Sequence, residues 1–332
     1  MVKYTNQYNH YSYNYIESRF SGGGYAISDW RQMDGYNLSR LAVIMATKQD
    51  GAGNQCLGAI SNREDIYYLA AYHLLLEVGE INKEAQETYL LKSRLPAFKR
   101  RVAQAEQAIS QAVETCKNPA ISFSFGKDSL VCVDIATRIK PDILIINIDR
   151  GRGGDLDEAV EIYDTYAREQ RWNYHRIKAP REIFEIYQEA GGVNKLKRGV
   201  IKKNLVAGFK TAREQLKYDC EITGLRANEN NERQYLRKYG TFHYSTAEKT
   251  WKCKPVLYWS GDDIWTYIIS RGLPYLRWYD LEARFTGYDK ARYSNWAGLI
   301  GRTYGRITRL KYNYPREYAQ LAKVFPEIAF YV

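Results

Sequence analysis

The sequence lacks several patterns that would define its class directly. Its 332 residues include five cysteines, Cys56, Cys116, Cys132, Cys220 and Cys253, and none of them forms a Cys-x-x-Cys pair. This spacing argues against a disulfide framework and against a zinc site on one loop, and it suits a reducing compartment. No apolar run approaches the ~20 residues of a membrane span, and the first residues are polar and Tyr-rich instead of basic and then apolar. We therefore expect a cytoplasmic protein with no membrane partner.

A short polar segment follows the apolar stretch Ala120–Phe123 and precedes a helix-like run from Leu130 to Ile139. The segment reads Ser124, Phe125, Gly126, Lys127, Asp128, Ser129. A strand that turns into a helix N-terminus presents unpaired backbone N–H groups at the positive end of the helix dipole, which is a phosphate site. The glycine allows close approach, the serines can donate hydrogen bonds, the lysine adds charge, and the aspartate can help to hold magnesium. The Walker spacing is absent.

Strand and helix patterns alternate after residue 119. Apolar strands are expected at 120–123, 143–148, 174–177 and 220–223, with helical stretches at 128–139, 155–168 and within 181–217. Such repeats predict an α/β fold in which a parallel sheet is sandwiched by helices. Because ligands bind beyond the carboxyl ends of such strands, Ser124, Asp149 and Gly224 should lie along one ligand-binding edge.

Three regions are predicted along the chain. Residues 1–118 form a mainly helical N-terminal region, with one helix at about 97–113 after Pro96. Residues 119–275 form the nucleotide-binding domain, with a last helix beginning at Ser260 under a capping pattern with Asp263. Residues 276–332 form a basic, Tyr-rich C-terminal extension.

The net charge of +11 is concentrated in two basic tracts. Residues 195–217 contain eight basic residues against one acid, and residues 284–316 contain another eight against one acid, with interleaved tyrosines. Basic groups neutralise phosphates, and aromatic faces stack on bases. The tracts indicate contact with nucleic acid, DNA being favoured, or a solvated basic surface, or Arg and Lys side chains that contact only the nucleotide in the active site.

The loop resembles the Ser-Gly-Gly-x-Asp-Ser loop of the PP-loop ATP pyrophosphatases, with Phe125 in place of a glycine. The segments 223–226 (Thr-Gly-Leu-Arg), 254–256 (Lys-Pro-Val) and 259–268 resemble the phosphoadenosine phosphosulfate reductase family in order and spacing. The resemblance covers about residues 118–275 and implies an adenine nucleotide alpha hydrolase-like fold. It implies catalytic roles for Lys127, Asp128 and Arg226, magnesium binding by Asp128, and nucleotide binding by Ser124, Phe125, Gly126, Lys127, Asp128, Ser129, Asp149 and Gly224.

Two departures from the family affect the expected chemistry. The reductases share a C-terminal Glu-Cys-Gly-Leu-His segment whose thiolate attacks the sulfonucleotide, whereas no cysteine follows Cys253 here. Relatives in DNA phosphorothioation often have a cysteine-rich segment, and residues 292–299 occupy that place without cysteine. We therefore expect no iron–sulfur cluster.

These features favour an ATP pyrophosphatase that adenylates an acceptor for sulfur transfer, with ATP and Mg²⁺ as cofactors. It resembles the ATP pyrophosphatase component of DNA phosphorothioation systems, with a sulfur-donor protein such as a cysteine desulfurase as a further partner. One alternative is a nucleotide-binding subunit or sensor that has lost catalysis, because the Phe125 side chain stands where the family has none. Sulfonucleotide reduction is the third possibility.

Overall fold

The computed structural model describes residues 78–197, 199–229, 231–293 and 306–332. The chain divides into two compact units, 1–79 and 80–332, and everything below concerns the second. Its α-helices are α4 (Val78–Ser93), α5 (Pro96–Thr115), α6 (Lys127–Ile139), α7 (Asp157–Glu169), α8 (Ile183–Glu189), α9 (Val200–Leu216), α10 (Gly261–Arg271), α11 (Arg277–Thr286), α13 (Arg306–Asn313) and α14 (Pro315–Val324). Its strands are β1 (Pro119–Ser122), β2 (Leu144–Asp149), β3 (Asn173–Lys178), β4 (Cys220–Thr223), β5 (Phe242–Ser245) and β6 (Thr250–Cys253), and its 3₁₀ segments are η2 (Val193–Lys195), η3 (Ala227–Glu229), η4 (Asn231–Tyr239) and η5 (Pro326–Tyr331).

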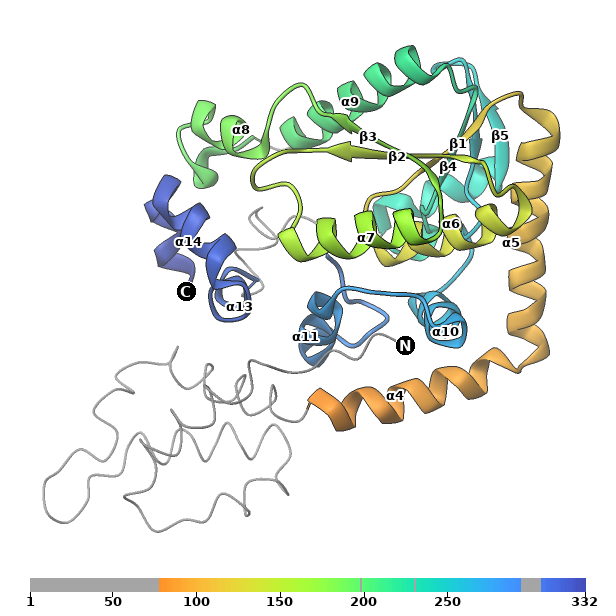
Figure 1. Cartoon of the computed structure of the whole chain (residues 1–332), viewed down its shortest axis with the longest axis horizontal. Helices are drawn as coiled ribbons and strands as arrows, with labels where there is room; N and C mark the ends of the chain where they lie inside the picture. Colours follow the sequence, from red (N-terminus) through yellow and green to blue (C-terminus); the bar gives the residue numbers. More distant parts are fainter. Residues whose placement is uncertain (1–77, 198, 230, 294–305) are drawn as a thin grey trace, which may run out of the picture. The chain divides into compact units, whose positions relative to one another are not determined.

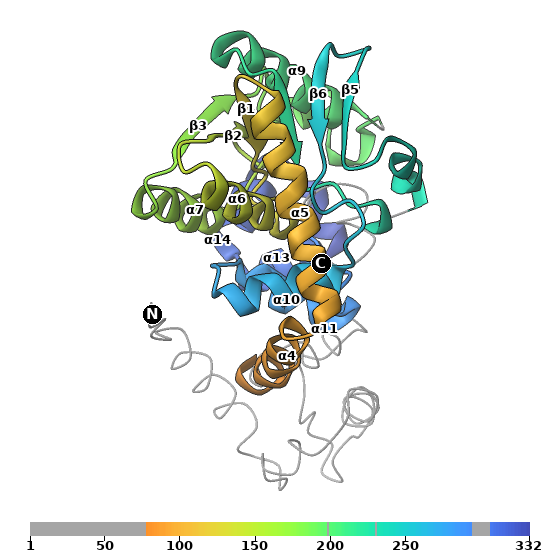
Figure 2. The ribbon, with the colours of Figure 1, turned by 90° about the vertical axis from the view of Figure 1, so that its right-hand side faces the viewer.

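The strands form one six-stranded sheet in the order β3-β2-β1-β4-β6-β5. All neighbours are parallel except β5 and β6, which are antiparallel. In Figure 2 the strands run from β3 on the left to β5 on the right. The central strands are apolar and buried because helices cover both of their faces.

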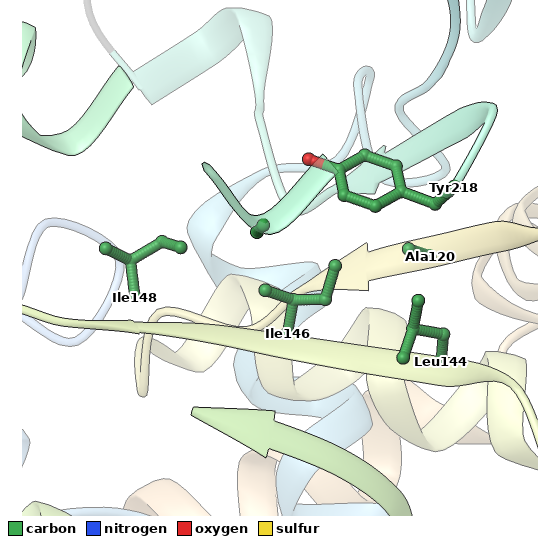
Figure 3. Packing of buried hydrophobic residues seen from close by; sticks show 6 residues of the cluster. Ala120, Leu144, Ile146, Ile148 and Tyr218 are labelled. Atoms are coloured by element: carbon green, nitrogen blue, oxygen red, sulfur yellow. The ribbon is translucent and has the colours of Figure 1, made fainter. Parts of the chain in front are cut away.

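One face of the sheet packs against α9. Ala120, Leu144, Ile146 and Ile148 form a buried cluster with Tyr218 and with Ala212 of α9. Figure 3 shows the side chains of β2 pointing to this side of the sheet. The Tyr218 hydroxyl donates a 3.1 Å hydrogen bond to the carbonyl of Phe209, which satisfies its polar end inside the apolar layer.

Helices α6 and α7 lie on the opposite face of the sheet from α9 (Figure 1). Alternate strand residues such as Ile121 and Ile145 are fully buried there. Helix α5 crosses in front of the central strands in Figure 2, and the Cys253 thiol of β6 donates to the carbonyl of Ala108 of α5. The predicted sandwich of a parallel sheet between helices is confirmed.

The predicted elements of this domain are present with small shifts in their ends. Helix α5 begins at Pro96, and α10 follows a capping box in which the Ser260 hydroxyl accepts from the Asp263 N–H while the Asp263 carboxylate accepts from the Ser260 N–H. Sequence patterns did not predict β5 and β6, which extend the sheet beyond β4. Each has only four residues and mixes polar with aromatic side chains, so neither presents a strong period-2 signal.

The structure divides into units 1–79 and 80–332, and the three regions with boundaries at residues 118 and 275 stay a prediction. Helix α5, and helix α4 from Glu80 onward, belong to the same unit as the sheet. The predicted helical content of the first 77 residues lies outside the described residues. Within the described ranges, none of the helices has the length and apolar character needed to cross a membrane.

Candidate nucleotide-binding site

The segment 124–129 forms the turn between β1 and α6, at the carboxyl end of the central strand. The Ser129 hydroxyl donates to the Gly126 carbonyl at 2.9 Å and accepts the Ser124 N–H at 3.2 Å. The exposed Ser124 hydroxyl lies 3.2 Å from that of Ser129. Ser129 therefore braces the turn internally, and Ser124 has the hydroxyl that can reach a ligand.

Phe125 has a left-handed backbone, with φ +57°, a conformation that favours glycine. Its ring is fully buried and stacks on Tyr163 at 5.2 Å, with Phe123 at 5.3 Å in an edge contact. Aromatic packing thus holds a backbone shape that the related loops obtain from glycine. The ring points into the core, so only the backbone of Phe125 can serve a nucleotide.

Gly224 lies where β4 ends, directly against the loop. A Cβ at this position would lie 2.6 Å from the Asp128 carbonyl carbon and 2.6 Å from the Ser129 nitrogen. Both of these are backbone atoms, which cannot rotate away as a side chain can. The predicted nucleotide-binding glycine therefore has a packing role, because it lets the 223–226 segment touch the loop.

Asp128 and Arg226 form an ion pair between the loop and the strand β4 exit. The Arg226 Nε donates to Asp128 Oδ1 at 2.5 Å, and the Lys127 Nζ lies 3.7 Å from Asp128 Oδ2. Burial alone would raise the pKa of Asp128, but the two cations outweigh it and hold that pKa below its usual value. The three predicted catalytic residues are thus in contact, with Asp128 ionised between the two cations.

Lys127 is covered by the C-terminal part of the chain. Its Nζ donates to the Ala291 carbonyl at 2.7 Å, and its backbone N–H donates to the Tyr279 hydroxyl at 2.9 Å. The side chain is only 2% exposed, and burial lowers the pKa of its ammonium group. The ammonium also lies over the Tyr279 ring, 5.3 Å from its centroid. Segments after residue 275 therefore help to build the site, although sequence reasoning placed them in a separate extension.

Two further arginines, which sequence reasoning did not select, lie close to this centre. Arg233 of η4 and Arg292 both ion-pair with Glu229, and both interact electrostatically with Asp128 and Arg226. Burial and neighbouring like charges lower the pKa of both guanidinium groups. The only signal in the sequence was that Arg292 falls within the second basic tract.

The site therefore contains more positive than negative charge. Among the residues that the structure describes, four cations, Lys127, Arg226, Arg233 and Arg292, meet two carboxylates, Asp128 and Glu229. Partly buried cations are costly unless they are neutralised. An anionic ligand would supply that neutralisation.

Asp149 ends β2 at the same sheet edge, as predicted. Its Oδ1 accepts the Gly151 N–H at 2.9 Å and lies 3.4 Å from Arg176 Nη2. The carboxylate thus braces the turn after β2 and remains half-exposed.

Asp128, as arranged here, does not fit a magnesium ligand, because both of its carboxylate oxygens face cations. In the described part of the chain, no three His, Cys, Asp or Glu side chains are grouped as a metal ion would require. Burial raises the pKa of the Cys220 and Cys253 thiols, that of Cys253 to about 12. The expected absence of an iron–sulfur cluster stays a prediction.

The two basic tracts differ in the structure. In the first, lysines such as Lys202, Lys203 and Lys210 of α9 are exposed. In the second, Arg306 and Arg309 are buried and bind the same carboxylate, Glu282, at 2.6 and 2.8 Å. Two of the eight basic side chains in the second tract are therefore internal, whereas Lys290 and Arg316 are exposed.

Comparison with known proteins agrees with this geometry. Residues 118–307, more than half of the chain, match the model of the phosphoadenosine phosphosulfate reductase domain. The chain belongs to this family. It is 26% identical over 209 residues to a phosphoadenosine 5'-phosphosulfate reductase of Aliivibrio salmonicida, covering 60% of this chain and 73% of the relative. It is 30% identical over 159 residues to an adenosine 5'-phosphosulfate reductase of Geobacillus kaustophilus, covering 46% of this chain and 63% of the relative.

Solved structures give more distant matches. A phosphoadenylyl-sulfate reductase from Candida auris aligns with a TM-score of 0.41 and 18% identity, covering 52% of this chain and 81% of that one. A U34-tRNA thiolase, NcsA, from Methanococcus maripaludis aligns with a TM-score of 0.42 and 14% identity, covering 70% of this chain and 81% of the thiolase.

Proposed function

We propose that this protein binds ATP over the 124–129 loop and transfers its adenylyl group to an acceptor oxygen, releasing pyrophosphate and activating the acceptor for sulfur transfer. The observation that supports it most is the excess of cationic side chains around Asp128, beside a strand–turn–helix loop. Both features favour a ligand with several negative charges. Membership of a family that acts on adenine nucleotides supports the same substrate class.

In this reaction, the acceptor oxygen forms a bond to the alpha phosphorus while the bond from that phosphorus to the pyrophosphate oxygen breaks. Negative charge develops on the departing pyrophosphate, where backbone N–H groups, Ser124 and Arg226 would stabilise it. Asp128 holds the Arg226 guanidinium in place through the 2.5 Å ion pair. A sulfur donor would then attack the activated centre and displace AMP.

The structure affects the two alternatives differently. The Phe125 side chain, which stands where the family has glycine, was the reason to consider a sensor without catalysis. Its ring is buried and leaves the loop unobstructed, so it no longer favours that alternative. Sulfonucleotide reduction needs an accessible thiolate. The cysteines in the described ranges, Cys116, Cys132, Cys220 and Cys253, are all buried with raised pKa values. As far as the described cysteines are concerned, adenylation is favoured over reduction; Cys56 lies outside the described residues.

The test is calorimetric ATP binding together with pyrophosphate release, measured on wild-type protein and on Arg226→Ala. Losing a buried charge partner of the phosphates should weaken ATP binding roughly tenfold or more. Arg271→Ala is the matched control, because it breaks another Arg–Asp pair, with Asp134, that joins α10 to α6 away from the loop. Equal ATP affinity in all three proteins, or sulfite release from a sulfonucleotide with a thiol donor, would contradict the proposal.

A further inference from the structure

The segment η4 links the cationic site to the open edge of the sheet. Arg233, near its start, ion-pairs with Glu229 beside Asp128, and Tyr239, at its end, contacts the edge strand β5. Leu236 anchors the segment by packing against Ala227 and Leu257. One side of η4 is thus fixed to the protein, and Tyr235, Arg237, Lys238 and Tyr239 are exposed to water.

The exposed residues of η4 include two aromatic and two basic side chains. Tyr235 is 60% exposed and Tyr239 is 43% exposed, and their ring centroids are 6.4 Å apart. Arg237 and Lys238 are exposed beside them, and the Lys238 ammonium lies 4.8 Å from the Tyr239 centroid. Leu236 and the end of the segment at Tyr239 attach η4 to the protein, whereas Tyr235 is 60% exposed, and exposed clustered rings of this kind mark contact surfaces.

The Tyr239 ring is held rigidly from behind. It stacks nearly parallel on His243 of β5, at 4.9 Å and 18°. His243 Nδ1 in turn lies 3.3 Å from the Lys254 Nζ, and burial and the neighbouring lysines lower the pKa of this histidine. Because the Tyr239 ring is already held in place, it loses little conformational entropy when a ligand binds to the η4 surface.

We infer that η4 is a binding platform for single-stranded nucleic acid, which would supply the acceptor. Unpaired bases can stack on exposed tyrosines, and phosphates can pair with Arg237 and Lys238. A duplex hides its base faces and would gain only the phosphate contacts. This part of the inference rests on the proposed function: a strand lying along η4 would have a phosphate near Arg233, beside the adenylating site.

The dimensions fit a short strand. The six residue steps from Arg233 to Tyr239 span roughly 12 Å at the ~2 Å rise per residue of a 3₁₀ helix. That length matches three to four stacked nucleotides at about 3.4 Å each. The platform differs from the two basic tracts, which sequence reasoning favoured for nucleic-acid contact.

The experiment measures fluorescence anisotropy of the full chain with labelled dT and rU 12-mers and with a DNA duplex of equal length. We expect both single strands to bind more tightly than the duplex. Tyr235→Ala should weaken single-strand binding roughly tenfold, whereas Tyr235→Phe, which keeps the ring, should not. Tyr312→Ala is the matched control, because Tyr312 is another exposed tyrosine with a lysine over its ring, on α13.

Several results would overturn the inference. They are failure to bind either single strand at low salt, equal binding of duplex and single strand, or unchanged affinity in Tyr235→Ala. Loss of binding only when Lys202 and Lys203 are changed to Glu would place the surface on α9 instead. ATP calorimetry on the same proteins separates the two proposals: oligonucleotide binding without ATP binding refutes the proposed function and leaves the platform, and the reverse refutes the platform alone.

Discussion

Gly224→Ala should displace the 124–129 loop while leaving the fold intact. The added methyl carbon would lie 2.6 Å from two backbone atoms of Asp128 and Ser129, whereas ordinary contacts begin at 3.4 Å. The loop or the β4 exit must therefore move by about 0.8 Å. Because a misplacement of about 1 Å in reacting groups can cost ~100-fold in rate, we expect ATP turnover to fall by roughly that factor.

The matched control is Gly208→Ala in α9. Its added carbon would also lie 2.6 Å from a neighbour, but that neighbour is the Ile148 side chain in the core between α9 and the sheet. Overpacking of this kind should cost about 1–3 kcal/mol of unfolding free energy, as Gly224→Ala also should. Only Gly224→Ala should lose ATP affinity and turnover beyond what its stability change explains.

The assay combines urea unfolding with ATP calorimetry and pyrophosphate release. The reasoning is refuted if Gly224→Ala folds and binds ATP like the wild type. It is equally refuted if both alanine variants lose activity in proportion to their stability, since the close approach to the loop would then have no specific role.

Three other perturbations test separate parts of the structure. Tyr279→Phe removes the acceptor of the Lys127 N–H and should weaken ATP binding severalfold in calorimetry with little change in melting temperature. Glu282→Gln leaves Arg306 and Arg309, both buried, without their carboxylate and should lower the unfolding free energy by about 3–5 kcal/mol in urea unfolding. Asp142→Asn breaks the exposed pair with Lys140 and should leave the urea midpoint nearly unchanged. Burial lowers the pKa of Lys254 to about 8, below its unfolded value of 10.5. Between these values the unfolded chain binds more protons, so the unfolding free energy should rise with pH from 8 to 10.5, and this rise should be absent in Lys254→Met.

The sequence alone determined the central α/β domain. Apolar runs at 120–123 and 143–148, alternating with amphipathic helices, specify a parallel sheet because each element carries its own periodic signal. The loop 124–129 was predictable for the same reason: its residues are contiguous, and the strand–turn–helix context is local. The capping box at Ser260 and Asp263 is equally local, and it appears as predicted.

Tertiary structure decided what completes the site. Arg233, Tyr279 and Arg292 reach the loop only because η4 and the segments after α10 pack against the end of the sheet. No local pattern records a contact between residues more than 100 positions apart, such as that of Lys127 with Tyr279. The short strands β5 and β6 likewise form because neighbouring strands supply their hydrogen-bond partners, since four residues alone have too weak a pattern to specify a strand. The direction of the Phe125 ring was also a tertiary outcome, because burial against Tyr163 decides which side of the loop it occupies.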